Sequence, residues 1–134
     1  MAEPAAVTDT HPLIFHAAGG RLLGPRARRL FAAAEHRQGL IYVPAAVVWE
    51  VSLLARVGRI DLRRPVRTFF DDLFSNPAYV PYELSIAQVL DADDLRFTRD
   101  PFDALICAAA RALEMPLMTR DAAIVAARVV PVTW

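Results

Sequence analysis

Short apolar segments alternate with longer helical segments along almost the whole chain, and this alternation constrains the fold most strongly. Each short segment is bounded by turn or helix signals, as strands are. The predicted strands cover residues 5–9, 40–44, 116–119 and 129–134, and residues 78–82 form either a short strand or an extended segment. Strands that alternate with helices are typical of α/β proteins with a mostly parallel sheet. We therefore predict an α/β fold.

The intervening segments carry helix start and stop signals. Gly24 and Pro25 open one helix and Gly39 follows its end, which is the usual placement of proline and glycine around a helix. After Pro65, apolar residues recur at helical spacing, and the resulting aromatic stripe of Phe69, Phe70 and Phe74 is predicted to be core. The predicted helices cover residues 12–18 (capped by Thr10 or His11), 25–38, 44–60, 65–75, 85–93, 101–114 and 120–127.

The composition excludes several classes of protein. The 134 residues, 55% of them hydrophobic, suit one domain with a real core. No apolar run approaches the roughly 18 residues of a membrane span, and residues 1–12 lack the pattern of a signal peptide. The single cysteine, Cys107, excludes a disulfide framework and a cysteine zinc site, and is predicted to be a buried core side chain. We expect a cytoplasmic protein without membrane contact.

The formal net charge is zero, but the charges are unevenly distributed. Residues 21–67 hold ten Arg and three acids, whereas residues 71–103 hold eight acids and two Arg. All 15 basic residues are Arg, which suits bidentate contacts with phosphate. Biased composition explains the absence of Lys, but it explains the clustering of Arg less easily. The first half therefore predicts a basic surface.

Two acids lie at or just beyond the ends of predicted strands. Asp9 ends the first predicted strand, and Asp121 lies two residues beyond the fourth. Ligands of parallel sheets bind beyond the carboxyl ends of the strands, so both acids are predicted at that edge. Each could instead serve locally, because Asp9 could be a turn residue and Asp121 or Thr119 could cap the next helix.

Glu50 lies on the apolar side of its predicted helix, close to Val47, Val51 and Leu54. A carboxylate without partners would be costly there. It could form an ion pair with an Arg, or it could be a metal ligand at the edge of a cleft.

Asp103 borders the apolar stripe of the helix that Asp100 and Pro101 open. It could simply favour the positive end of the helix dipole, or it could point into a cleft. Four carboxylates from separate segments, without Cys or clustered His, favour Mg²⁺ or Mn²⁺. Such an ion would hold the acids together and activate water for attack on a phosphodiester.

Several stretches together resemble the PIN-domain ribonucleases, and closely the VapC-type toxins of toxin–antitoxin pairs. They keep the order and spacing of that family and span nearly the whole chain. The stretches are TDTHPLIF (8–15), VPAAVVWEVSLLARVGRI (43–60), RDPFDALICAAARALEMPLMTRDAAI (99–124) and VVPVTW (129–134).

The resemblance implies one PIN domain over residues 1–134, a three-layer α/β/α sandwich with a short parallel sheet. It assigns the catalytic residues to Asp9, Glu50, Asp103, Asp121 and Thr119, and metal binding to the four acids among them. It further implies bound Mg²⁺ or Mn²⁺, endonucleolytic RNA cleavage, homodimers, inhibition by a cognate antitoxin, and contact with operator DNA only through that antitoxin.

The sequence departs from the family at Ala104, where a basic residue usually follows the third acid. This departure keeps open a second hypothesis, a catalytically weak binding module that acts in an antitoxin complex on operator DNA. Receiver domains and haloacid-dehalogenase-type phosphatases need a Lys that the chain lacks.

The three histidines, His11, His16 and His36, are predicted to be cap, core-edge or surface residues. The aromatic stripe could also form a groove for an antitoxin helix or a second subunit.

Overall fold

Five parallel strands form the centre of the protein. The structure, a computed structural model, describes residues 3–134, so Met1 and Ala2 of the N-terminal segment discussed above lie outside the described residues. The sheet has the order β3-β2-β1-β4-β5, and all four pairings are parallel. Its strands are β1 (Ala5–Thr8), β2 (Leu40–Pro44), β3 (Tyr79–Tyr82), β4 (Leu117–Met118) and β5 (Val132–Thr133).

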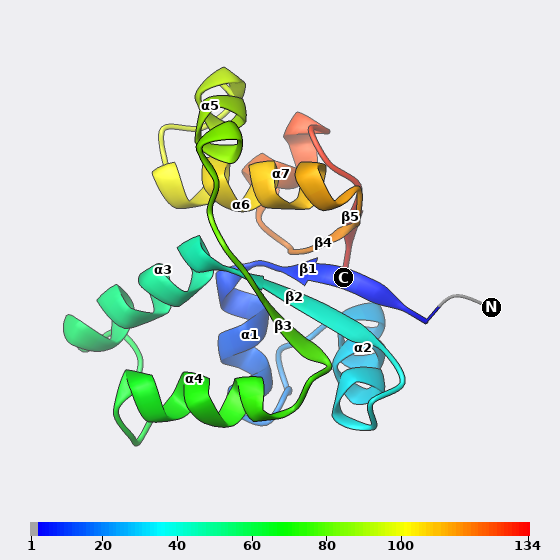
Figure 1. Cartoon of the computed structure of the whole chain (residues 1–134), viewed down its shortest axis with the longest axis vertical. Coiled ribbons are helices and arrows are strands. Elements are labelled where there is room, and N and C mark those ends of the chain that lie inside the picture. Colours follow the sequence, from blue (N-terminus) through cyan, green and yellow to red (C-terminus); the bar gives the residue numbers. More distant parts are fainter. Residues whose placement is uncertain (1–2) are drawn as a thin grey trace.

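Helices cover both faces of this sheet, which confirms the predicted three-layer arrangement (Figure 1). One side carries α1 (Thr10–Ala17), α2 (Pro25–Glu35), α3 (Ala45–Arg56) and α4 (Val66–Ser75). The other side carries α5 (Ile86–Asp94), α6 (Pro101–Leu113) and α7 (Ala122–Ala127). Among residues 3–134, no helix has the length and apolar character needed to cross a membrane.

The central strand β1 is the point at which the chain reverses its direction across the sheet. From β1 the chain builds outward through β2 and β3, and it then crosses back to β4 on the other side of β1. Val7 of β1 pairs with Tyr42 of β2 and with Leu117 of β4. A crevice at the carboxyl ends of two strands where the order reverses is the usual binding site of such sheets. This crevice lies between the ends of β1 and β4.

Apolar side chains from both helix layers fill the space around the sheet. Phe31 of α2, Leu13 of α1 and Ile106 of α6 are among the largest fully buried side chains. Cys107 is buried, as predicted from its apolar surroundings. Phe69 and Phe70 are buried and Phe74 is partly buried against the same core, so the prediction of a core aromatic stripe is confirmed.

Several helix boundaries differ from those expected; the helix predicted over residues 44–60, for example, ends at Arg56. The first helix begins at Thr10 rather than Pro12, because Asp9 caps it by accepting a hydrogen bond from the backbone N–H of Thr10. Pro12 is then in the first turn, where a missing N–H costs little. The second helix ends at Glu35, and the chain turns through Arg37 at a φ of 57°.

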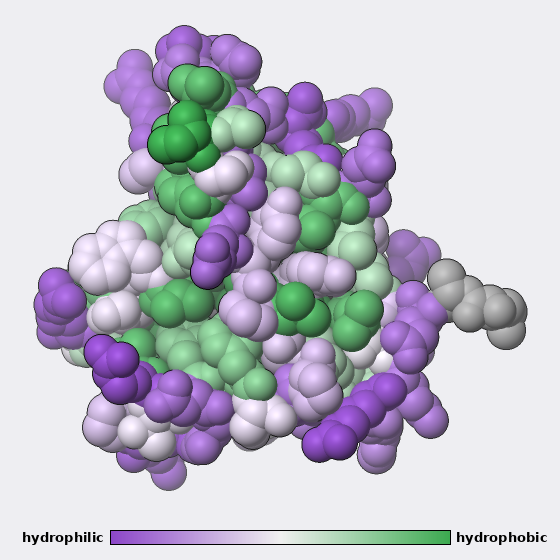
Figure 2. All heavy atoms as spheres, in the orientation of Figure 1, coloured by the Kyte–Doolittle hydropathy of each residue, from purple (hydrophilic) through white to green (hydrophobic). Residues whose placement is uncertain are grey.

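One face of α5 exposes apolar side chains to solvent. Ile86 and Leu90 are 78% and 63% exposed, and Val89 and Leu84 are also exposed. Figure 2 shows hydrophobic atoms gathered over this helix at the top of the molecule, bordered by hydrophilic ones. Among residues 3–134 none covers these side chains, although α5 packs against α6 through its other side.

Candidate active site

Asp9 stands at the reversal point of the sheet and is fixed by two hydrogen bonds. Its Oδ1 accepts from the Thr10 N–H at 2.8 Å, and its Oδ2 accepts from the Thr119 hydroxyl at 2.7 Å. Asp9 directly follows β1 and Thr119 directly follows β4, so the two neighbouring strand ends are joined through side chains. Asp9 is 6% exposed and Thr119 is 1% exposed. The carboxyl group is therefore held in one orientation.

Asp121 combines a structural role with a place near this pair. It is the N-cap of α7, because its Oδ1 accepts from the Ile124 N–H at 3.0 Å. Its own N–H donates to the Thr119 hydroxyl oxygen at 3.0 Å. Thr119 therefore connects Asp9 with the segment of Asp121, and the capping role considered from the sequence is confirmed.

Asp103 lies in the first turn of α6 and is half-buried. Capping of this helix falls to Asp100, which accepts from the N–H groups of Phe102 and Asp103 at 2.8 and 3.4 Å. One turn further along α6, burial and the carboxyls of Asp9, Asp103 and Asp121 raise the pKa of Cys107 to about 12. The inner face of α6 thus adjoins the acids at the strand ends.

Glu50 is the acid that α3 contributes, and it is half-buried. Within residues 3–134 it forms no ion pair with any Arg, so the salt-bridge interpretation finds no support. The Thr10 hydroxyl is fully buried and lies close enough to lower the pKa of Glu50, although it makes no hydrogen bond of ordinary geometry. Among the described residues, therefore, no cation accounts for a carboxyl at this position.

The carboxyls of the site influence one another electrostatically. Burial, followed by the nearby carboxyls of Asp100, Asp121, Asp9 and Glu50, raises the pKa of Asp103 to about 7. Burial also raises the pKa of Asp9 and of Glu50, against the lowering effects of Thr119 on Asp9 and of Thr10 on Glu50. All four acids therefore contribute to one field of negative charge, which a cation would relieve.

The donor set fits a hard divalent cation, but the side chains do not form a closed cage. Among residues 3–134, no three His, Cys, Asp or Glu side chains are close enough together to hold a metal ion by themselves. Mg²⁺ is commonly bound through one or two carboxylates while it keeps several waters or contacts substrate phosphates. Carboxylate oxygens at an open, negatively charged strand edge suit that mode. The orphan hydroxyl of Thr10 could hydrogen-bond to such a water.

Thr10 is the site residue that the motif-based assignment did not include. From the sequence it was considered only as a helix cap, a role that Asp9 performs. Its position directly after the acid at a strand end was the available signal. That the hydroxyl is buried without a partner depends on how α1 and α3 pack, which the sequence pattern does not specify.

The raised pKa of Asp103 predicts a pH-dependent stability of the metal-free protein. Because the folded state binds this proton more tightly than the unfolded chain, the free energy of unfolding falls as the pH rises from about 4 through 7. Asp103→Asn cannot ionise and should be about 1–2 kcal/mol more stable than the unmodified protein at pH 8, after allowance for solvent screening. Urea unfolding in EDTA at pH 4 and pH 8 measures this, and an equal effect at both pH values would contradict it.

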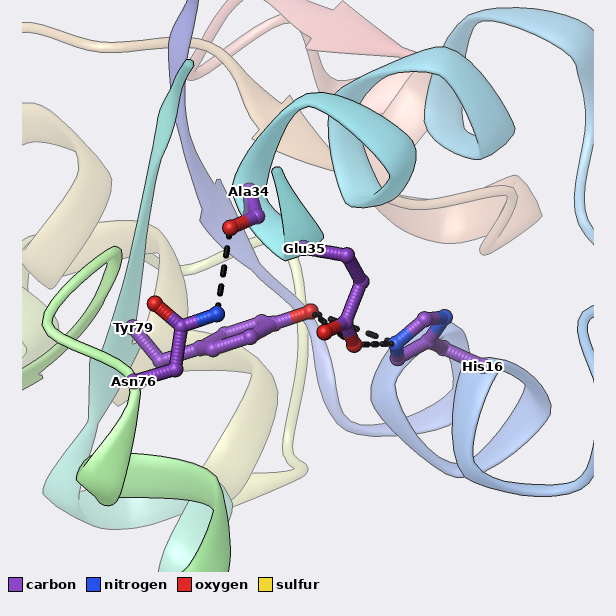
Figure 3. A network of polar contacts seen from close by, with 5 residues as sticks. All are labelled: His16, Ala34, Glu35, Asn76 and Tyr79. Carbon is purple, nitrogen blue, oxygen red and sulfur yellow. Dashed lines mark hydrogen bonds and ion pairs between the residues drawn. The ribbon is translucent and has the colours of Figure 1, made fainter. Parts of the chain in front are cut away.

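A large cavity lies away from these acids. It has a volume of about 960 Å³ between α1, α2, α4 and the segment before α4, and none of the four acids lines it. His16, Glu35, Asn76 and Tyr79 border it and form a polar network (Figure 3). Glu35 Oε1 lies 2.7 Å from His16 Nε2 and accepts from the Tyr79 hydroxyl at 2.9 Å. Burial and the Glu35 carboxylate raise the pKa of Tyr79.

The histidines occupy the kinds of position predicted for them. His16 lies at the edge of the core, where it stacks on Phe31 with ring centroids 4.3 Å apart. His11 is exposed near the start of α1, and His36 is exposed at the end of α2. The network around His16 joins α1, α2 and β3, so it stabilises the layer opposite α6 and supplies none of the four acids.

Comparisons with known proteins agree with this architecture. The chain is similar to a chain of VapBC2 from Rickettsia felis bound to a DNA fragment from its promoter, with a TM-score of 0.69 and 14% identity over 96% of this chain and 97% of that one. It is also similar to a chain of a toxin–antitoxin complex from Klebsiella pneumoniae, with a TM-score of 0.62 and 20% identity over 93% and 94%. At these identities the likeness concerns the fold.

No match is found among curated proteins. The family model described as PIN domain matches residues 6–129, which include β1 through α7 and all four acids. The chain therefore belongs to the PIN-domain family.

Proposed function

We propose that the protein is a metal-dependent endoribonuclease and the toxin of a toxin–antitoxin pair. The observation that carries the proposal is Asp9, a nearly buried carboxyl fixed by Thr10 and Thr119 at the reversal point of the sheet. Glu50, Asp103 and Asp121 add negative charge around it from three other segments. Membership of the PIN-domain family, whose members are generally nucleases, supports the assignment.

A divalent cation, Mg²⁺ or Mn²⁺, would supply an activated water and charge stabilisation for attack on a phosphodiester. Asp9 is the most precisely oriented of the candidate ligands, because both of its oxygens already accept hydrogen bonds. Asp121 uses Oδ1 to cap α7, which leaves its other oxygen for the site. Asp103 and Glu50 approach from α6 and α3 and complete the negative surface that would face the scissile phosphate across the cation.

The partners follow from the two similar structures. One contains VapBC2 with promoter DNA and the other is a toxin–antitoxin complex, so we infer a cognate antitoxin and operator DNA contacted only through it. We also propose that residues 1–134 form a single PIN domain and that the chain forms a homodimer. The exposed apolar face of α5 offers a surface that a second copy could bury, and sedimentation equilibrium would test the dimer.

The direct test is an RNA cleavage assay with purified protein and Mg²⁺ or Mn²⁺, with EDTA as the metal-free control. Cleavage that requires metal and stops when the co-expressed antitoxin is present supports the proposal. The competing hypothesis, a binding module that acts mainly in an antitoxin complex on operator DNA, rests on Ala104 in place of the usual basic residue. It predicts antitoxin and operator binding without cleavage at any metal concentration. Sequencing of RNA 5′ ends after induction would then identify the RNA.

Glu50→Gln separates a role in metal binding from a structural role. Since Glu50 forms no ion pair with any described residue and burial raises its pKa, the substitution should leave the metal-free protein equally or more stable. It should weaken Mg²⁺ or Mn²⁺ binding about tenfold, because one anionic oxygen donor is lost. Melting curves with and without metal measure both effects. An equal loss of stability in EDTA would instead reveal a structural ion pair.

A further inference from the structure

A cation held by two aromatic rings lies in the segment between β4 and α7, next to Asp121 in the sequence. The guanidinium carbon of Arg120 is 4.9 Å from the centroid of the Phe15 ring and 5.6 Å from that of Trp134. The two rings meet edge to face at 6.4 Å. Contacts of this kind hold an arginine in a preferred orientation while its N–H groups remain available. We call Phe15, Arg120 and Trp134 the arginine platform.

Backbone contacts fix the position of Trp134 within this platform. Its ring lies directly on Gly24, where an added Cβ would come within 2.4 Å of Trp134 Cδ1. Its carbonyl oxygen accepts from the N–H of Arg26 at 3.2 Å. Only glycine allows the ring to approach the start of α2 so closely. The platform therefore stands on α1, the first turn of α2 and the end of β5, three elements of the rigid fold.

Arg120 occupies the position between two residues of the site, Thr119 and Asp121. It is exposed, and it forms no ion pair and no side-chain hydrogen bond with any residue from 3 to 134. A guanidinium one position before Asp121 in the chain, yet oriented by aromatic rings instead of by a carboxylate, has its donors free for a ligand. The ligand it fits best is an anion that binds across the acids.

We propose that Arg120 binds a phosphate of the RNA next to the scissile bond and so positions the strand over the acids. The inference rests on the proposed function and names a substrate contact within the same site. A field of carboxylates repels an RNA backbone, and a fixed guanidinium offsets that repulsion where the strand enters. Arg presents paired donors that match phosphate oxygens, and the two rings, which are only partly buried, can stack against a base.

The arginines near the platform suggest from which side an RNA strand approaches the acids. Arg26, Arg28 and Arg29 lie in the first half of α2, and the Arg26 backbone contacts Trp134 directly. The platform therefore lies between the basic start of α2 and the acids at the ends of β1 and β4. An RNA strand that crosses α2 meets Arg120 before it reaches Asp9 and Asp121.

The test compares Arg120→Gln, Arg120→Lys and the unmodified protein. Binding of a mixed-sequence single-stranded RNA oligonucleotide is measured by fluorescence anisotropy in EDTA, and cleavage of the same RNA is measured with Mg²⁺. Arg120→Gln should bind roughly fivefold to twentyfold more weakly, with a raised KM and little change in kcat. For Arg120→Gln, the slope of log affinity against log salt concentration should be less steep by about 0.7. This is the value for one phosphate contact to a single strand. Arg120→Lys keeps the charge without the planar fork and should bind with intermediate affinity.

The matched control is Arg128→Gln, which removes the same charge from an exposed arginine at the other end of α7, just before β5. It should leave affinity and salt dependence unchanged. Unchanged melting temperatures for both Gln variants show that the fold is intact. A role of Arg120 only in anchoring Trp134 predicts the opposite pattern, a lower melting temperature with unchanged RNA affinity.

The inference is overturned if Arg120→Gln binds RNA within twofold of the unmodified protein with the same salt dependence, or if Arg128→Gln loses as much affinity. Arg120→Lys binding as tightly as the unmodified protein would overturn the part assigned to the planar guanidinium. RNA binding that depends on Arg120 without any cleavage would contradict the proposed function while supporting this inference. A protein that binds no RNA would overturn both.

Discussion

Replacing Asp9 by Asn is expected to reduce metal-dependent RNA cleavage at least about 1000-fold, because the most tightly positioned carboxylate of the site loses its charge. The substitution preserves the shape of the side chain. The remaining Oδ1 still accepts from the Thr10 N–H, and the Thr119 hydroxyl can accept from the new amide where it now donates to Oδ2. Since burial raises the pKa of Asp9, removal of its charge should not destabilise the metal-free protein.

Rates of cleavage at saturating Mg²⁺, together with melting curves, measure both parts of this expectation. Asp71→Asn is the control, because Asp71 is an exposed acid on α4 and the change removes the same charge away from the site. It should retain full activity, whereas residual cleavage by Asp9→Asn in EDTA would reveal a contaminating ribonuclease. An Asp9→Asn protein that keeps more than a tenth of the activity would refute the placement of the catalytic centre at the end of β1.

Replacing Phe31 by Ala should lower the free energy of unfolding by about 3–5 kcal/mol. Phe31 is 1% exposed and belongs to the core, where it stacks on His16 and lies 6.5 Å from the Tyr79 ring. Truncation removes buried apolar surface and leaves a cavity beneath the polar network of His16, Glu35 and Tyr79. Because α1 also carries Asp9 at its start, the loss should be accompanied by weaker metal binding.

Urea unfolding at a fixed pH gives the size of this effect. Leu22→Ala provides the comparison, because Leu22 is 58% exposed and its truncation should change stability by no more than about 0.5 kcal/mol. A loss below about 1.5 kcal/mol for Phe31→Ala would mean that the layer formed by α1 and α2 can collapse around the missing ring.

The order of elements could be predicted from the sequence because each element carries local signals. Alternating short apolar runs and helix signals place all five strands and all seven helices in the described residues within a few positions. The start of α1 differs from the prediction because a side chain decides where that helix begins. Asp9, rather than Thr10 or His11, caps α1 because its carboxylate reaches the Thr10 N–H from an extended backbone.

The candidate acids could also be predicted, since strand ends and helix starts determine which side chains reach the same edge of a parallel sheet. The structural role of each acid, by contrast, could not be predicted from the sequence. Asp121 and Asp100 both open helices in the sequence, and only the folded arrangement shows that Thr119 links Asp121 to Asp9 across 110 positions of the chain. Likewise, no pattern around Glu50 distinguishes an ion pair from an unpaired carboxyl, because the partners would come from distant segments.

By itself, therefore, the sequence determined the α/β alternation, the parallel sheet and the residues that can carry oxygen ligands, because periodicity and capping act over a few neighbouring positions. The tertiary structure decided the strand order that puts the ends of β1 and β4 side by side. It also decided the raised pKa of Asp103 and the seating of Arg120 between Phe15 and Trp134. These depend on distances between segments that are far apart along the chain, and such distances are set by how the layers pack.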